Sequence, residues 1–136
     1  MKSTAAAYLA TLIAFVAIDF VWLSFAAERL YRPVLKDILL DGFRPAPAVV
    51  FYFLFAAGLV VLAVRPGLAA GSLWLAVGNA AMVGLIGYAT YDLTNQATLK
   101  NWSTWLTVAD LAWGSFVSVS ATSLGRWATL WIAPPA

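Results

Sequence analysis

Charged residues are placed so sparsely in this chain that four long stretches are almost free of them. Asp19 and Asp110 are the only charges within these stretches, which cover residues 3–27, 46–64, 66–91 and 101–125. Each stretch is close to the roughly 20 residues with which an α-helix crosses a bilayer. The pattern predicts one transmembrane domain over residues 1–136, with helices at about 4–27, 46–64, 67–92 and 102–126.

The overall composition supports a membrane protein. Hydrophobic residues make up 63% of the 136 residues and charged residues 10%, against about one half and about one quarter in soluble domains. A soluble domain of this length cannot bury so much apolar surface. We therefore expect an all-α, polytopic four-helix bundle, and we exclude a soluble enzyme and a disordered chain.

The connections between the predicted helices differ in character. Residues 28–45 contain Pro33, which suits a first helical turn, and Gly42, which suits the position after a helix end. The amphipathic spacing between them predicts a short interfacial helix at the headgroups, with a solvated loop as the alternative. Residues 65–67, Arg-Pro-Gly, predict a turn, and residues 92–100 predict a polar connection.

Several kinds of chemistry are excluded by the residue types that are missing. The chain has no cysteine and no histidine, so it has no disulfide, no thiolate zinc site, no imidazole base and no His-ligated haem. We expect no cofactor and no metal, and we assign no catalytic residue. The net charge of +2 is too small to indicate nucleic acid. The lipid bilayer is the expected partner, and the seven tryptophans fit anchors at its two interfaces.

Three aspartates are predicted to converge in one leaflet. Asp19 lies eight residues before Ala27, and Asp110 lies eight residues after Trp102, which puts both about 12 Å below the same membrane surface. Asp92 ends the third helix on that side. A charge at the centre of a membrane helix costs about 3 kcal/mol on the insertion scale. Such residues are therefore default candidates for a functional site.

Helical spacing predicts that two of these acids face the interior. Asp110 shares a face with small residues, which are typical of close helix packing in membranes: Gly114, Ser118, Ala121 and Gly125. Asp92 continues a similar ridge formed by Ala80, Gly84 and Tyr88. Nothing comparable fixes the rotation of Asp19.

A seven-residue pattern, D-x-x-W-x-S-F, occurs at residues 19–25 and again at 110–116. The spacing places the indole N–H groups of Trp22 and Trp113 on the same face as the aspartate of their own helix. Chance similarity in a Trp-rich chain is the alternative to a functional pairing.

The segment 88–102 holds the densest set of polar side chains. Capping of the helix ends would account for one or two of these polar side chains. A polar pocket at the membrane interface would account for all of them. In that pocket Lys100 would neutralise Asp92 or meet an anionic headgroup. The predicted binding or proton-handling residues are Asp19, Trp22, Tyr88, Tyr91, Asp92, Asn95, Lys100, Asp110 and Trp113.

The sequence YATYDLTNQATL at residues 88–99 resembles the signature of a family of small bacterial predicted membrane proteins, known as domain of unknown function 2177. The resemblance extends to Asp19-x-x-Trp22, Tyr31, Phe51-Tyr52 and Asp110-x-x-Trp113-Gly114. It implies a multi-pass protein of the bacterial inner membrane and supplies no catalytic residue.

Three functional hypotheses remain. Membrane-embedded carboxylates favour proton-linked binding or transport of a small amphipathic molecule. In size alone the chain is similar to small multidrug exporters that act as dimers, so a homo-oligomer is an open alternative. An interfacial enzyme acting on a lipid or isoprenoid would use the aspartates and Asn95 to hold Mg²⁺. The third hypothesis is a structural or accessory membrane subunit.

Overall fold

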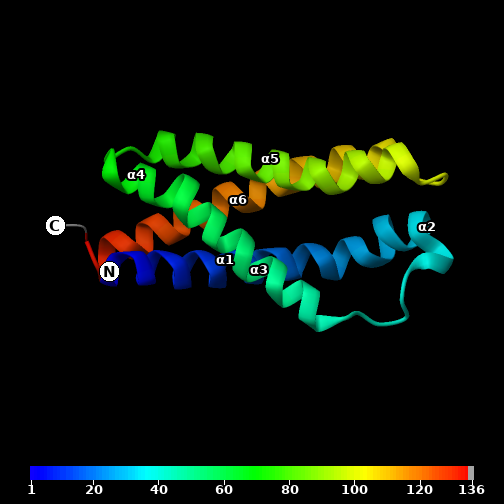
Figure 1. Ribbon diagram of the computed structural model, residues 1–136, viewed down its shortest axis with the longest axis horizontal. Coiled ribbons are helices and arrows are strands. Elements are labelled where there is room, and N and C mark those ends of the chain that lie inside the picture. The colour runs from blue at the N-terminus through cyan, green and yellow to red at the C-terminus, as the bar shows by residue number, and fades with distance from the viewer. Residues whose placement is uncertain (135–136) are drawn as a thin grey trace.

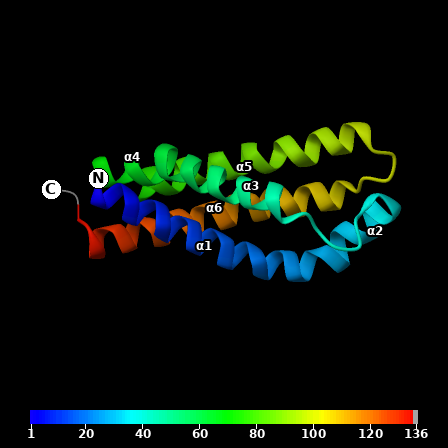
Figure 2. The same cartoon turned by 60° about the horizontal axis from the view of Figure 1, so that its bottom comes forward.

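The computed structural model describes residues 1–134, and the regular elements in this part of the chain are all helical (Figure 1). They form four rods, each antiparallel to the next along the chain (Figures 1 and 2). The first rod consists of α1 (Lys2–Ala26), the π-helical turn η1 (Ala27–Tyr31), α2 (Arg32–Leu35) and the 3₁₀ turn η2 (Lys36–Ile38). The second rod consists of α3 (Pro45–Leu59), the π-helical turn η3 (Val60–Val64) and α4 (Arg65–Ala69). The other two rods are α5 (Leu73–Thr98) and α6 (Thr104–Ile132). The predicted bundle of four long helices is confirmed.

The turn predicted at residues 65–67 is wrong, because these residues form α4. Pro66 cannot donate the backbone hydrogen bond of a regular helix. The π turn η3 immediately before α4 changes the bonding pattern, and the rod continues through the proline. The chain instead reverses after Ala69, where Gly71 adopts a φ of 61°, a conformation that glycine reaches without steric cost.

The other two connections are also more helical than predicted. The expected interfacial helix within residues 28–45 is not separate, because η1 and α2 continue the first rod to Leu35. The helical backbone is interrupted at Lys36, which has a φ of 39°, and η2 and the irregular residues 39–44 follow. The expected polar connection at 92–100 is largely part of α5, which ends at Thr98. Thr94 and Thr98 donate to carbonyl groups one turn earlier in α5, so these polar side chains are compatible with helix.

The fourth helix lies at the centre of the packing. α6 contacts both α1 and α5 along their lengths. Its predicted small-residue stripe is confirmed, since a Cβ atom on Gly114 would overlap the ring of Tyr88, and one on Gly125 would overlap Thr11. The main apolar core fills the space around this stripe with Phe15, Leu59, Ala63, Ala80, Val117 and Ala121.

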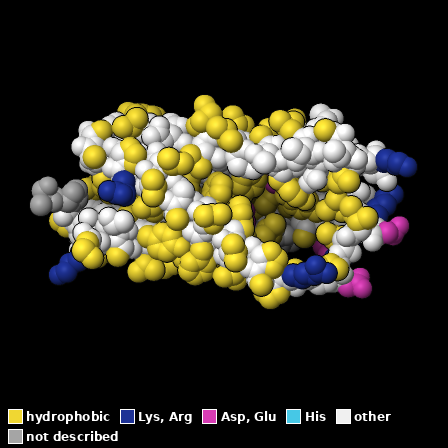
Figure 3. All heavy atoms as spheres, viewed as in Figure 1, with side chains coloured by type: hydrophobic (Ala, Val, Ile, Leu, Met, Phe, Trp, Pro, Cys, Tyr) yellow, Lys and Arg dark blue, Asp and Glu magenta, His cyan; other side chains and the backbone are white. Residues whose placement is uncertain are grey.

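Apolar side chains cover the middle of the rods, and the charged side chains gather toward the two ends (Figure 3). By length and composition, the rods at residues 2–38, 45–69 and 73–98 are able to cross a membrane. The helix α6 is not among these three spans, and its buried residues include five polar ones: Thr107, Asp110, Ser118, Thr122 and Thr129.

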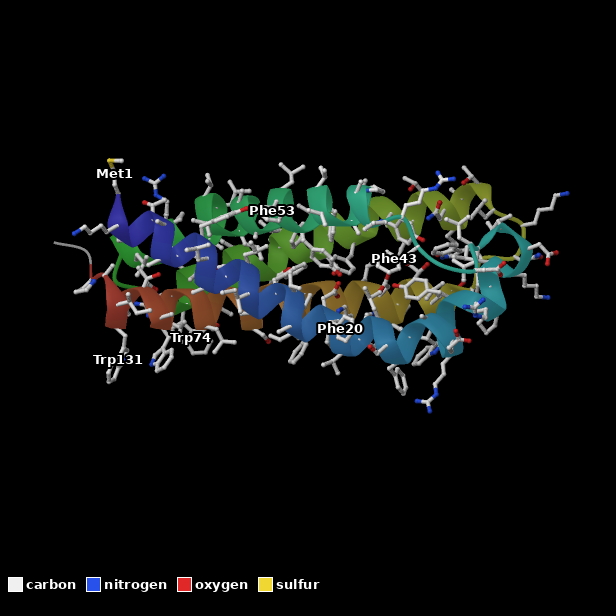
Figure 4. The ribbon with its side chains drawn as sticks, turned by 90° about the horizontal axis from the view of Figure 1, so that it is seen from below. Met1, Phe20, Phe43, Phe53, Trp74 and Trp131 are labelled. Carbon is white, nitrogen blue, oxygen red and sulfur yellow. The ribbon has the colours of Figure 1, made fainter. Side chains whose placement is uncertain are left out.

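The tryptophans show that α6 also has the dimensions of a membrane span. Its exposed Trp105 and Trp127 lie 22 residues apart, which is about 33 Å along a helix and close to the thickness of the hydrocarbon core. Trp74 and Trp131 lie at the same end of the bundle (Figure 4). Tryptophans at both ends fit the two interfaces of a bilayer.

Candidate functional site

Asp19 is the point at which all four rods meet. Its carboxylate accepts hydrogen bonds from the hydroxyl of Tyr52 on α3 at 2.7 Å, from the indole of Trp113 on α6 at 2.9 Å and from the hydroxyl of Tyr88 on α5 at 3.4 Å. The side chain is 4% exposed, and all three donors are uncharged. These donors satisfy the carboxylate without a counter-ion.

Asp110 on α6 has one tyrosine donor of its own. The hydroxyl of Tyr31 donates to the Asp110 carboxylate at 2.5 Å, and Asp110 is 2% exposed. Tyr31 is the last residue of the π turn η1. A π turn adds one residue to a helical turn and so rotates the side chains that follow. Tyr31 thus bonds Asp110 from a part of the first rod where the regular helical spacing is interrupted.

The two tryptophans of the repeated pattern stack on each other between the two aspartates. The ring centroids of Trp22 and Trp113 are 4.7 Å apart with an interplanar angle of 9°. The spacing places each indole on the same face as the aspartate of its own helix, and the indole of Trp113 donates to Asp19 on α1. Trp22 lies near Asp110 and Tyr31, but its buried N–H has no hydrogen-bond partner within residues 1–134.

Asp92 on α5 faces Asp110 across the antiparallel pair of helices. Tyr88 packs against Gly114, and one turn further Asp92 and Asp110 come close enough to interact electrostatically. Asp92 is fully buried, and neither of its carboxylate oxygens has a hydrogen-bond partner within residues 1–134. The structure thus brings together two acids of which one has no donor.

Beyond this pair, toward the end of the bundle, four polar side chains are joined by hydrogen bonds, and we call them the Gln96–Thr107 ladder: Gln96, Thr104, Thr107 and Trp102. Gln96 lies one turn beyond Asp92, accepts a hydrogen bond from Thr107 at 2.7 Å and donates one to Thr104 at 2.9 Å. The indole of Trp102 donates to Thr107 at 2.9 Å. The ladder ties α5 to α6 at the end where their connection lies.

Six of the nine predicted residues lie in the cluster: Asp19, Trp22, Tyr88, Asp92, Asp110 and Trp113. The other three lie outside it. Tyr91 is exposed and packs its ring against Trp102 at 5.6 Å. Asn95 is half-buried beyond Asp92, and Lys100 is exposed. The only ion pair within residues 1–134 joins Arg32 to Glu28, so Lys100 does not neutralise Asp92.

Two tyrosines of the cluster were not among the predicted residues. Tyr31 and Tyr52 both donate to buried aspartates of another helix, and neither aspartate lies near its tyrosine in the sequence. The resemblance to the family included both tyrosines, and it was the only signal that pointed to them. Gln96 was missed for a similar reason, because its partners belong to the next helix.

A hollow in the surface opens beside the cluster. The N-terminal end of α3 diverges from the other rods (Figure 1), and Figure 3 shows a depression at this place, with acidic side-chain atoms visible inside it. Within residues 1–134 no three acidic side chains are grouped so that they could hold a metal ion. Asp19, Asp92 and Asp110 therefore do not form one common group of three acidic ligands.

The fold and the cluster define a helical membrane protein with several apolar helices and an interior group of acids. The model of the family described as Predicted membrane protein (DUF2177) matches residues 4–127. The chain belongs to this family, and the expected resemblance is confirmed. No curated protein matches the chain, and no solved structure matches it.

Proposed function

We propose that this protein binds a small cationic, amphipathic molecule within the membrane and exchanges it for a proton held by Asp92 and Asp110. The observation that carries the proposal is the side-by-side burial of these two acids. Two adjacent carboxylates in a low-dielectric site cannot both be ionised at low cost. A shared proton or a bound cation relieves their repulsion.

The surroundings of the pair favour a cation from outside the chain. Within residues 1–134 neither acid is paired with a lysine or arginine. The stacked rings of Trp22 and Trp113 lie beside the pair, and aromatic faces attract cations by about 0.5 to 2 kcal/mol. The hollow in Figure 3 opens on the side of the bundle. An amphipathic molecule dissolved in the lipid would reach the acids by this route.

The structural hypothesis accounts for Asp19 but not for Asp92. Asp19 has three donors from three other rods and so joins the bundle together. Within residues 1–134, Asp92 accepts no hydrogen bond from a tyrosine or tryptophan, and the group beside it is the second acid, Asp110. Leaving a buried polar group without a partner costs about 1 to 3 kcal/mol, which a purely structural residue does not repay.

Proton release on ligand binding tests the proposal. Purified protein in weakly buffered detergent solution is titrated with tetraphenylphosphonium, an aromatic cation, while pH and heat are recorded. We expect saturable binding with the release of up to about one proton per chain, and loss of that release in Asp92→Asn and Asp110→Asn. The exposed Asp41→Asn is the matched control. Binding without proton release, or no binding across a panel of such cations, would contradict the proposal.

A further inference from the structure

A groove lies on the surface between the first and second rods, at the end of the bundle that holds α4 (Figure 1). It has a volume of about 660 Å³, and most of its lining is apolar. The lining comes from both rods: Thr4, Ala5 and Tyr8 of α1, then Ala57, Val60 and Arg65 of the second rod. Arg65 is the first residue of α4, so its charge lies at the end of the groove nearest the end of the bundle.

The walls of this groove are held in place by the packing of the two rods. Ala7, Val60 and Val64 form a small buried cluster of their own, and the ring of Tyr8 packs against it. The hydroxyl of Tyr8 also donates to the carbonyl oxygen of Phe53 on α3 at 3.1 Å. This bond joins the rods at the end of the groove nearer the middle of the bundle. The groove is therefore formed before any ligand enters it, which lowers the cost of binding.

The length and position of the groove match one leaflet of a bilayer. From Ala57 to Arg65 the lining covers eight residues, which is about 12 Å at the α-helical rise. Half of the hydrocarbon core is about 15 Å thick. The exposed Trp74, Trp127 and Trp131 mark this end of the bundle as interfacial. The groove thus runs from the interface toward the bilayer centre, the direction in which the acyl chains of lipids run.

Charge complementarity indicates which lipid fits. The basic residues at this end are Lys2, Arg65 and Arg126, and the six acids of the chain occur at residues 19, 28, 37, 41, 92 and 110, away from it. On the face drawn in Figure 3, the end that holds α4 carries basic but no acidic side chains. Arg65 is exposed, and within residues 1–134 it forms no ion pair. Its guanidinium is free to bind a phosphate through two parallel N–H groups.

We propose that the groove binds one anionic phospholipid, with an acyl chain between α1 and η3 and the phosphate on Arg65. Basic pockets between membrane helices bind acidic lipid headgroups in this way. A zwitterionic lipid would bring its cationic group into the same positive field and would bind more weakly. The site lies apart from the buried acids, uses none of their residues and does not depend on the proposed function.

Native mass spectrometry of the full chain in mild detergent tests the site. Phosphatidylglycerol and phosphatidylcholine with the same acyl chains are added in equal amounts. We expect the first bound lipid to be phosphatidylglycerol, and we expect Arg65→Gln to weaken its binding by about fivefold or more, the effect of one basic residue at a lipid headgroup. Ala5→Leu should weaken it to a similar extent, because the larger side chain occupies the space of the acyl chain.

Matched variants distinguish this groove from general surface effects. Lys2→Gln removes a charge from the same end without changing the lining of the groove, and Ala17→Leu makes the same apolar change at an exposed position of α1 outside it. Both should bind phosphatidylglycerol within about twofold of the wild type, since solvent screens a charge that does not touch the lipid. Circular dichroism establishes that Ala5→Leu is folded, and Thr4→Leu replaces it if it is not.

Three results would overturn the proposal. Equal binding of the two lipids, or equal losses in Arg65→Gln and Lys2→Gln, would show attraction by diffuse charge instead of a headgroup site. Displacement of the lipid by excess inorganic phosphate would show an anion site that takes no acyl chain. Unchanged lipid binding in Ala5→Leu, together with a change of oligomeric state on gel filtration, would make the groove an interface between copies of the chain.

Discussion

The indole of Trp113 on α6 donates to the carboxylate of Asp19 on α1, although the two residues are 94 positions apart in the chain. The reverse pair is also close in space, because Trp22 of α1 lies beside Asp110 of α6. Stacking of the two indoles holds the crossed pairs together. In each of the two D-x-x-W segments, the tryptophan therefore lies next to the aspartate of the other helix.

Replacing the two tryptophans separately distinguishes the bonded indole from the unbonded one. Trp113→Phe removes the hydrogen bond to Asp19 and leaves a buried carboxylate short of a donor, which costs about 1.5 to 3 kcal/mol for a charged partner. Trp22→Phe keeps an aromatic ring and loses an N–H that has no partner within residues 1–134. We expect Trp113→Phe to lower the thermal unfolding midpoint in detergent clearly more than Trp22→Phe. Equal shifts would contradict the assigned bond.

Two glycines of α5 provide a matched test of the close contact between α5 and α6. A Cβ on Gly84 would overlap the carbonyl oxygen of Gly114, whereas a Cβ on Gly78 meets nothing within 4 Å. Gly84→Ala must push the two helices apart, and overpacking of this kind costs about 1 to 3 kcal/mol. Gly78→Ala should be stabilising by about 0.5 to 1 kcal/mol, because it removes a glycine from a helix interior.

Unfolding by sodium dodecyl sulfate, followed by circular dichroism, measures both glycine variants under the same conditions. The midpoint should fall for Gly84→Ala and rise for Gly78→Ala. A Gly84→Ala protein as stable as the wild type would show that α5 and α6 are not in close backbone contact at this turn.

Tyr31→Phe tests the hydrogen bond that the last residue of the π turn η1 makes to Asp110. The variant loses only the hydroxyl that bonds Asp110 at 2.5 Å, and we expect a loss of about 1 to 3 kcal/mol of unfolding free energy. Tyr91→Phe, whose hydroxyl is on an exposed side chain, should change the unfolding free energy by less than about 0.5 kcal/mol. Chemical denaturation in detergent checks both variants, and equal losses would be inconsistent with the Tyr31–Asp110 bond.

The number and approximate position of the long helices could be predicted because charge placement alone limits where a chain can cross lipid. The inward direction of Asp92 and Asp110 followed from helical spacing, and both are buried as predicted. Helical spacing could not predict which side chain donates a hydrogen bond to each aspartate. Tyr31 and Tyr52 reach their aspartates only through the packing of separate helices and, for Tyr31, through a π turn that local sequence does not indicate.

The helix boundaries near the two prolines were harder to predict for a related reason. Proline is a reliable indicator of a turn in soluble proteins, yet here Pro33 and Pro66 each follow a π turn within a continuing rod. In a membrane every backbone group must find a partner, and a local change of helical bonding satisfies the groups that proline frees. The predicted turn at residues 65–67 was therefore displaced to residues 70–72.

Isosteric replacement of Asp19 and Asp92 separates an acid that holds the bundle together from one that does not. Asp19→Asn replaces one acceptor oxygen with an N–H₂ donor, so the hydroxyl of Tyr52 must turn from donating to accepting, and the carboxylate that accepted all three hydrogen bonds is lost. We expect a loss of about 2 kcal/mol or more. Asp92→Asn removes a carboxyl group that has no partner within residues 1–134 and stands beside Asp110, so its unfolding midpoint should equal or exceed that of the wild type. If Asp92→Asn were instead the less stable variant, Asp92 would be a structural residue, and the proton-sharing role assigned to the Asp92–Asp110 pair would be lost.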